Sequence, residues 1–500
     1  MSQDYLGSGG RLDGGPADAL IDAGYRYESQ AGPRLARGLS TSDLAHAVML
    51  AEAGAIPGDQ ARALLSALLE LDAIPGDAFP WNPALGDAFN SREHELRARA
   101  GATAAGWLSA GRPRREAFRV GLRIVARDGA RDLHNACVAL AAALVDLSAR
   151  HADDLAADYT YLQPAQPTRL GHLVLAYAYP VLRDAARLRG IHEELDMSVA
   201  GAGGSAGSRW PLDRSRLADL LGTAGTVPHV KDAMWQWDPY VDLMSAAAIT
   251  ATHQSELAQD LEILASREFG IVQLADRHSR ASALMPQKRN PYALAVVRAT
   301  AGTVAGDLAG MLVALHTGSA RTDHFHVLNT VVPRALEEVV ASTRLMAEVV
   351  AGLTLDATRA AEAARSGFIT AADLSDVLAQ EAGLDYRTAH HVVGRAVKML
   401  VDSGRDESAL TPELLAEAAM ASDGIVLQVD ADLMQRALDP EAAADMRLQE
   451  GSSAPGRTEE MVAACRADIA AARSWGSDAR GRAERAEGAL RARAREIAGT

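Results

Sequence analysis

The chain has few of the residues that build cross-linked or sheet-rich proteins. Of its 500 residues only two are cysteines, Cys137 and Cys465, which lie far apart and have no metal-ligating companions. A disulfide framework and a zinc site are therefore not expected, and a reducing compartment suits the sequence. Aromatic residues make up only 4%, and β-branched runs are short, whereas alanine and leucine, which are strong helix formers, recur throughout. This balance predicts a helical protein.

Segments for export, membrane insertion or nucleic-acid binding are also missing. The start, MSQDYLGSGG, lacks the basic and apolar regions of a signal peptide. The longest apolar run, near Ala136 to Val145, is about half of the ~20 residues that a membrane span requires. A net charge of −15 disfavours a nucleic-acid or anionic-membrane surface, although clustered arginines can still bind an anionic substrate. We therefore expect a cytoplasmic protein without nucleic-acid or membrane partners.

The spacing of apolar residues divides the chain into three parts. Residues 1–113 mix short helical segments with turn-rich stretches and predict an N-terminal helical domain. Residues 114–366 carry apolar stripes in steps of three and four, which is typical of long packed helices. Residues 367–500 predict a C-terminal helical domain and tail. The expected fold class is all-α, with three helical domains and a long central helix bundle that tetramerises.

Two short glycine motifs suggest other enzyme classes. Residues 203–207 fit the G-x-S-x-G nucleophile elbow of hydrolases, and Gly201, Gly203 and Ala206 fit the dinucleotide fingerprint. Both motifs need a β-strand immediately before the glycines. The residues that precede them here form a charged amphipathic helix. The pattern therefore favours a flexible or anion-contacting loop over either enzyme class.

The stretch RASALMPQKRNPYALAVVRATAG, residues 280–302, is the most informative part of the sequence. A loop with Met285, Lys288 and Asn290 runs into a long helix at Pro291. Backbone N–H groups at a helix start, together with an ammonium and an amide, form a good site for a carboxylate or an oxyanion. The alternative, on chemistry alone, is an ordinary helix start with solvated charges.

This stretch resembles the signature loop of the aspartase/fumarase superfamily, G-S-S-x-M-P-x-K-x-N, in the form that argininosuccinate lyases have. With residues 285–288 aligned to that motif, the family's catalytic serine falls on Ser282. Further blocks resemble argininosuccinate lyases in the same order along the chain: residues 105–123, 158–172, 201–208, 368–395 and 438–455. The resemblance spans essentially the whole chain, which is identified as an argininosuccinate lyase-like member of the superfamily.

The resemblance implies a lyase that removes the proton α to a carboxylate and breaks a carbon–nitrogen bond of a substituted succinate by anti β-elimination, with release of fumarate. It assigns Ser282 as the general base, activated by loop N–H groups and by Lys288. Lys288 and Asn290 would stabilise the charge that moves onto the carboxylate. The remaining substrate-binding residues are Thr160, which would hold a carboxylate, Arg112 and Arg114, which would fix the second one, and Gln163 and Met285. No cofactor or metal is expected.

Two departures from argininosuccinate lyases bear on the substrate. The family's histidine and its glutamate partner are replaced by Tyr161 and Ala295. Tyr161 is the candidate catalytic acid, but a phenol, with an ordinary pKa near ~10, donates a proton at neutral pH only if neighbours such as the arginines at 112–115 tune it. The segments that recognise arginine, at Asp87-Ala88-Phe89 and in residues 316–330, lack the family pattern. A different leaving group is therefore favoured.

Three functions remain open. The first is a lyase for a substituted succinate other than argininosuccinate, such as an N-substituted aspartate or nitrosuccinate. The second is argininosuccinate lyase itself, with an unusual acid. The third is a non-catalytic scaffold, which the retention of Ser282, Lys288 and Thr160 disfavours. By resemblance, the partners are a small dicarboxylate substrate and further copies of the chain, in a homotetramer whose active sites are shared between subunits.

Overall fold

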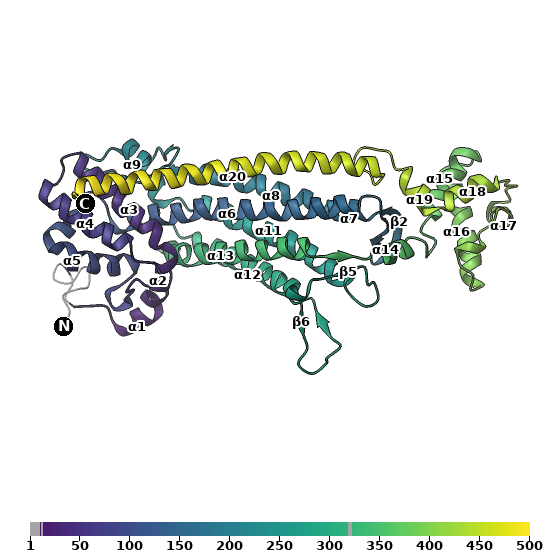
Figure 1. Ribbon diagram of the computed structural model, residues 1–500, viewed down its shortest axis with the longest axis horizontal. Helices are drawn as coiled ribbons and strands as arrows, with labels where there is room; N and C mark the ends of the chain where they lie inside the picture. Colours follow the sequence, from purple (N-terminus) through teal and green to yellow (C-terminus); the bar gives the residue numbers. More distant parts are fainter. Residues whose placement is uncertain (1–10, 12–13, 319–322) are drawn as a thin grey trace.

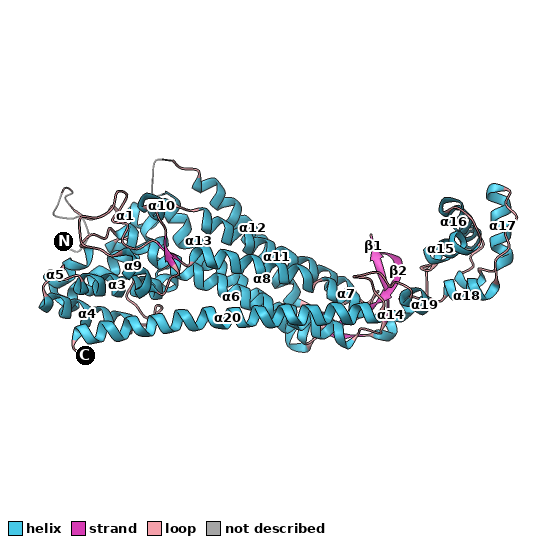
Figure 2. Ribbon diagram, turned by 90° about the horizontal axis from the view of Figure 1, so that it is seen from above, coloured by secondary structure: helices cyan, strands magenta, loops and turns pink. Residues whose placement is uncertain are grey.

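The long axis of the molecule follows one helix, α6 (Arg114–Arg150), which spans about 55 Å at 1.5 Å per residue. The computed structural model describes residues 11, 14–318 and 323–500 and is mostly helical. The first ten residues, where no signal peptide is expected, and part of the 316–330 block lie outside the described residues. Figures 1 and 2 show long helices running nearly parallel to α6, so that the described chain forms a rod.

A continuous apolar core holds the central bundle together. On α6, Leu133, Cys137, Leu140, Leu144 and Leu147 are buried at steps of four and three residues, the repeat that keeps one seam facing neighbouring helices. The other bundle helices are α7 (Leu170–Ala176), α8 (Ala178–Leu195), α11 (Asp238–Leu264), α12 (Tyr292–Leu315) and α13 (Asp323–Ala351). This arrangement confirms that the fold is helical, although the described chain is mostly helical and not all-α as predicted.

The helices at the N-terminal end of the rod form a second core around Leu64 and Leu68. They are α3 (Gly32–Glu52), α4 (Gly58–Asp72) and α5 (Ala88–Gly106), with α9 (Arg214–Leu221) and α10 (Val230–Trp235) from later in the chain. The short helices α1 (Asp18–Leu20) and α2 (Arg26–Gln30) precede them and add no apolar residue to this core. α5 begins at Asp87, whose carboxylate accepts the N–H groups of Phe89 and Asn90. The two cores meet along α6.

The C-terminal part of the chain packs in two places. A small domain with its own core contains α15 (Ala371–Glu381), α16 (Tyr386–Asp402), α17 (Pro412–Asp423) and α18 (Ala431–Leu438). α20 (Pro455–Ala498) then runs back along the bundle, about 66 Å long, and Figure 1 shows it reaching the N-terminal helices. Its Leu490 and Ala494 are buried in the N-terminal core. The predicted C-terminal domain and tail therefore cover two parts that pack on different neighbours.

In the described residues, four two-stranded sheets, which the sequence did not predict, interrupt the helices. They pair β1 (Leu155–Thr160) with β2 (Gln163–Arg169), β3 (Met197–Ser198) with β4 (Gly225–Thr226), β5 (Val272–Gln273) with β8 (Thr354–Leu355), and β6 (Arg280–Ala281) with β7 (Arg289–Asn290). α14 (Ala357–Ala363) links the β5–β8 sheet to the small domain along the chain. α19 (Pro440–Asp445) packs on β2. Two of these sheets present predicted site residues.

α12 leaves much of its apolar surface uncovered. By length and composition alone, α6 and α12 could each cross a membrane, a test that the buried core helix of a bundle also passes. The apolar stretch of α6 is mostly buried, whereas only 22% of that of α12 is. Val296, Leu312 and Val313 of α12 are exposed. Exposed apolar side chains on a long helix are a feature that interaction surfaces share.

Candidate active site

The arginine group, Arg112 and Arg114, lies where α6 begins. Arg112 is buried, and its Nη2 donates to Asp43 at 2.7 Å while Nη1 donates to Ser42 at 3.2 Å. The more exposed Arg114 is the first residue of α6 and pairs with Asp87 at 2.9 Å. Arg112 is therefore fixed by the protein itself, whereas Arg114 keeps N–H groups available for a ligand.

A glycine-rich loop closes over the arginine group. Glu116 accepts the N–H groups of Gly201 and Gly203, both at 2.7 Å, and so ties the loop to the first turn of α6. The glycine-rich loop, the start of α6 and Phe89 surround an open hollow of about 530 Å³. It is also lined by Arg112, Arg114, Gly207, Ser208 and Arg209. Arginine side chains beside a helix N-terminus suit an anion. The glycines thus form the anion-contacting type of loop that the sequence favours. They follow helix α8 and a strand of only two residues, and not the long strand of a hydrolase or dinucleotide-binding motif.

The hairpin group, Thr160, Tyr161 and Gln163, lies at the opposite end of α6. Thr160 pairs with Gln163, and Tyr161 and Leu162 form the two-residue turn with φ of 54° and 58°. Such a turn, left-handed at both positions, matches the twist of its strands but strains residues with a Cβ atom. The Tyr161 side chain is 99% exposed. The proposed tuning of Tyr161 by the arginines at 112–115 is wrong within one chain, because the length of α6 separates them.

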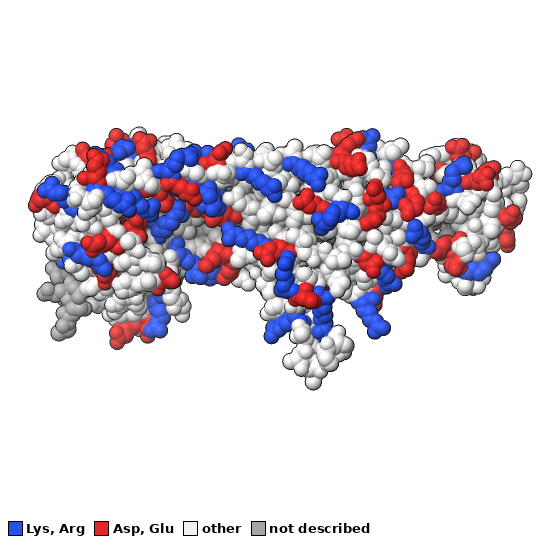
Figure 3. Space-filling view, viewed as in Figure 1, with Lys and Arg blue, Asp and Glu red and all other residues white. Residues whose placement is uncertain are grey.

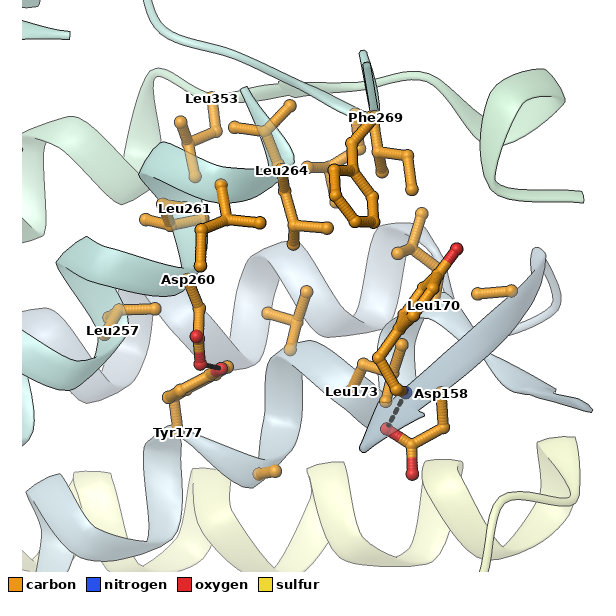
Figure 4. Close-up of a pocket in the computed structure, with 18 of the residues that line it drawn as sticks. Asp158, Leu170, Leu173, Tyr177, Leu257, Asp260, Leu261, Leu264, Phe269 and Leu353 are labelled. Carbon is orange, nitrogen blue, oxygen red and sulfur yellow. Dashed lines mark hydrogen bonds between the residues drawn. The ribbon is translucent and has the colours of Figure 1, made fainter. Parts of the chain in front are cut away.

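A largely apolar pocket of about 520 Å³ lies behind the hairpin group. Figure 4 shows it between Leu170 and Leu173 on one side and Leu261, Leu264 and Phe269 on the other. At its polar end, Tyr177 donates a hydrogen bond to Asp260. Burial and this carboxylate both raise the pKa of Tyr177, so the phenol stays protonated. The pocket supports the hairpin from below and carries none of the predicted site residues except Tyr161.

The serine loop, residues 281–290, projects from the side of the bundle between β6 and β7 (Figure 1). The N–H groups of Leu284 and Met285 donate to Ser282 Oγ at 3.3 and 3.0 Å, and the Lys288 N–H donates to the Met285 carbonyl at 3.0 Å. Asn290 donates to the Arg280 carbonyl at 3.1 Å. Leu284 at the tip is 83% exposed. Figure 3 shows the tip free of charged side chains, with basic ones near its base.

The predicted site residues therefore form three separate groups in one chain. Ser282, Met285, Lys288 and Asn290 are brought together by the serine loop, and Thr160, Tyr161 and Gln163 by the hairpin. Arg112 and Arg114 stand apart from both. Sequence reasoning missed Asp43 and Glu116, which position Arg112 and the glycine loop. Their partners are 69 and 85 or more residues away in sequence, so no local pattern indicates them, whereas Asp87 before α5 carries a readable helix-start signal.

Comparison with known proteins agrees with this architecture. A family model described as "Lyase" matches residues 40–306, and one described as "Argininosuccinate lyase C-terminal" matches residues 368–445. The argininosuccinate lyase of Methanoculleus marisnigri is 33% identical over 441 residues, which cover 87% of this chain and 88% of that protein. That of Methanothermobacter thermautotrophicus is 30% identical over 426 residues, covering 84% and 89%.

Solved structures are similar over nearly the whole length. An EDDS lyase variant with bound fumarate has a TM-score of 0.87 and 27% identity, covering 98% of this chain and 97% of that chain. A class II fumarase from Schistosoma mansoni, at 15% identity and a TM-score of 0.70 over 86% and 93%, shares the fold. Fold and relatives thus define a lyase. More particularly, the chain belongs to the argininosuccinate lyase family within the fumarase/aspartase superfamily, which confirms the family that the sequence resembles.

Proposed function

We propose that this lyase eliminates the carbon–nitrogen bond of an N-substituted aspartate and releases fumarate, with Ser282 as the base. The observation that carries the proposal is the turn at Ser282, where two backbone N–H groups donate to Oγ. Donors aimed at a hydroxyl oxygen stabilise its alkoxide form and so lower its pKa. The ammonium of Lys288, in the same loop, adds a positive charge that acts in the same direction. A serine held in this way suits the removal of a weakly acidic proton.

The remaining groups suit the rest of the reaction. Loss of the proton α to a carboxylate moves charge onto that carboxylate, and donors already in place lower the barrier. Lys288 and Asn290 of the serine loop and Thr160 of the hairpin supply such donors. Arg114, with N–H groups left over from its pair with Asp87, would hold the second carboxylate in the hollow beneath the glycine loop. Arg112 would keep that hollow in shape.

We infer further that the active site forms between copies of the chain in a homotetramer. The arginine group and the hairpin group are too far apart to meet within one chain, because the length of α6, about 55 Å, separates them. The uncovered apolar face of α12 offers the surface for association. Its Gly302, Gly306 and Gly310 lie one turn apart, with open space where a Cβ atom would stand, so another helix can approach closely. Packing of α12 helices from several copies would cover this face.

The likeness to EDDS lyase supports an N-substituted aspartate as the substrate. EDDS, ethylenediamine-N,N′-disuccinate, is itself such a compound, and the similarity covers both chains almost completely. Tyr161 and Ala295, in place of a histidine and its carboxylate partner, also favour a leaving group other than that of argininosuccinate. An amine that departs already protonated, or nitrite from nitrosuccinate, needs little help from an acid.

The test is fumarate formation from three substrates, followed by ultraviolet absorbance: EDDS, argininosuccinate and nitrosuccinate. We expect turnover of EDDS, and a loss of about 10²–10⁴-fold in Ser282→Ala. Ser403→Ala, in the small domain, is the matched control and should keep full activity, and circular dichroism checks that both variants fold. An active Ser282→Ala enzyme would overturn the assignment of the base.

Argininosuccinate lyase is the second candidate function, because the curated relatives with 30–33% identity carry that name. The same assay separates the two candidates. Turnover of argininosuccinate at least tenfold more efficient than that of EDDS would replace the first proposal by the second. Turnover of nitrosuccinate alone would keep the serine chemistry and change the leaving group.

A further inference from the structure

A cluster of aromatic rings and arginines lies beside the arginine group, at the junction of α6, α10 and α13. The guanidinium of Arg115 lies 4.0 Å from the ring centre of Trp235 and 4.9 Å from that of Phe325. Arg119, one turn further along α6, lies 4.1 Å from the Phe325 ring. Stacking on two rings fixes the plane of the Arg115 guanidinium while leaving its N–H edge unused. Arg115 forms no ion pair or hydrogen bond within residues 14–318 and 323–500.

The inner part of this cluster holds several buried nitrogens without partners. Arg119 is only 1% exposed, and its Nε donates to the Met234 carbonyl at 3.2 Å. Trp235 Nε1 and His324 Nε2 have no hydrogen-bond partner in the described part of the chain, and Nη1 and Nη2 of Arg119 have none apart from the nearby Tyr240 hydroxyl. A buried polar group left without a partner destabilises the folded protein. Such a concentration of donors points to an acceptor that binds at this place.

The electrostatics of the cluster agree with a negatively charged ligand. Burial, with Arg115 and Arg123 nearby, lowers the pKa of Arg119 to about 10, so it is still charged at neutral pH. Burial, and after it the charges of Arg119 and Arg115, lower the pKa of His324 to about 4, which leaves this ring neutral. Trp235 also lines an open hollow of about 450 Å³ whose rim carries both signs of charge: His229, Lys231, Asp232 and Asp238. A mixed rim suits an amine that bears a carboxylate.

We propose that Arg115, backed by Arg119, binds a carboxylate carried by the leaving amine of the substrate. The inference rests on the proposed function and extends it to the half of the substrate that departs. Arg114 and Arg115 are the first two residues of α6, and consecutive helical side chains project about 100° apart. Arg114 can therefore hold the succinyl half while Arg115 reaches the leaving half. Both contacts start from one rigid helix end.

The experiment compares two substrates that differ in one group, N-(2-carboxyethyl)aspartate and N-propylaspartate. The first carries a carboxylate where the second carries a methyl group, and fumarate formation gives kcat and KM for each. We expect the wild-type enzyme to prefer the carboxylate substrate by roughly tenfold to a hundredfold in kcat/KM, the range of one charge-assisted hydrogen bond. Arg115→Met keeps the length of the side chain and should abolish the preference through KM, with N-propylaspartate turned over as before.

Two controls keep the result specific. Arg62→Met, on the exposed face of α4, should leave the preference unchanged, and Trp235→Phe, which keeps a ring but removes the buried N–H, should weaken it less than Arg115→Met does. An equal preference in wild type and Arg115→Met, or a parallel loss on both substrates, would overturn the inference alone. Absence of fumarate from both substrates with the wild-type enzyme would overturn the proposed function, and this inference with it.

Discussion

Tyr161 occupies the place of the family's histidine but has none of the surroundings that activate an acid. It lies in a left-handed turn, its side chain points away from the chain, and it has no hydrogen-bond partner within the described segments. The phenol that does have a carboxylate partner is Tyr177, behind the hairpin, whose pKa is raised. Within one chain, the surroundings of Tyr161 therefore favour a role in shaping the site rather than in donating a proton.

Replacing Tyr161 by phenylalanine tests this role. Because the ring is kept and only the hydroxyl is lost, we expect kcat to stay within about tenfold of wild type, well short of the ~10²–10⁴ typical of a lost general acid. Steady-state fumarate release under saturating substrate gives the value, with Tyr386→Phe, on the small domain, as the control. A thousandfold loss in kcat at unchanged stability would identify Tyr161 as the acid.

At the scale of elements, α3 holds the segment that leads to the arginine group through a buried histidine. His46 is 2% exposed, and its Nε2 donates to the Ala110 carbonyl at 2.9 Å, two residues before Arg112. Burial, and after it the charge of Arg112, lowers the pKa of His46 from 6.5 to about 3. In the folded protein this ring therefore remains neutral in mild acid, whereas it becomes charged once the chain unfolds.

The free energy of unfolding should consequently decrease as the pH is lowered. Between pH 6.5 and 5 the unfolded chain binds a proton at His46 and the folded one does not, so the free energy of unfolding decreases as the pH falls, by about 2 kcal/mol for this group. Urea unfolding at fixed protein concentration measures the decrease, and His46→Gln should show correspondingly less of it. Identical pH slopes for the two proteins would contradict a lowered histidine pKa.

Elements differ in how well the sequence predicts them, for physical reasons. The helix expected from Pro291 is α12, because its apolar residues recur at helical spacing and a proline precedes it. The β1–β2 hairpin was missed, because its turn is Tyr161-Leu162 instead of the glycine or asparagine that left-handed turns prefer. The pairing of Arg112 with Asp43 crosses 69 residues and is set by packing. Sequence motifs thus predict candidate site residues, but not which of them meet.

At the scale of the whole molecule, the separation of the three groups leads to a test by complementation. If active sites are shared between copies, Ser282→Ala inactivates the serine loop of one variant. Thr160→Val inactivates the hairpin of the other variant. Some sites in mixed tetramers then receive an intact copy of each group. We expect two inactive variants to regain part of the wild-type activity after they are unfolded and refolded together. Refolding each alone is the control.

The size of the assembly provides a second measurement on the same samples. Sedimentation equilibrium should give four times the chain mass of 52.7 kDa. Gly306→Leu, which adds bulk to the uncovered face of α12, should weaken association and activity together. A stable, active monomer would contradict the shared site, and so would mixed samples that remain inactive although they contain hybrid tetramers.

The return of α20 to the N-terminal helices has a consequence for how the protein is made. Leu490 and Ala494 fill the same core as Leu64 and Leu68, yet the ribosome produces the two sets several hundred residues apart. At 5–20 residues per second this interval is about 20–80 s. Throughout that time the nascent N-terminal helices lack part of their core and expose apolar side chains. The N-terminal core can therefore close completely only once α20 has been synthesised.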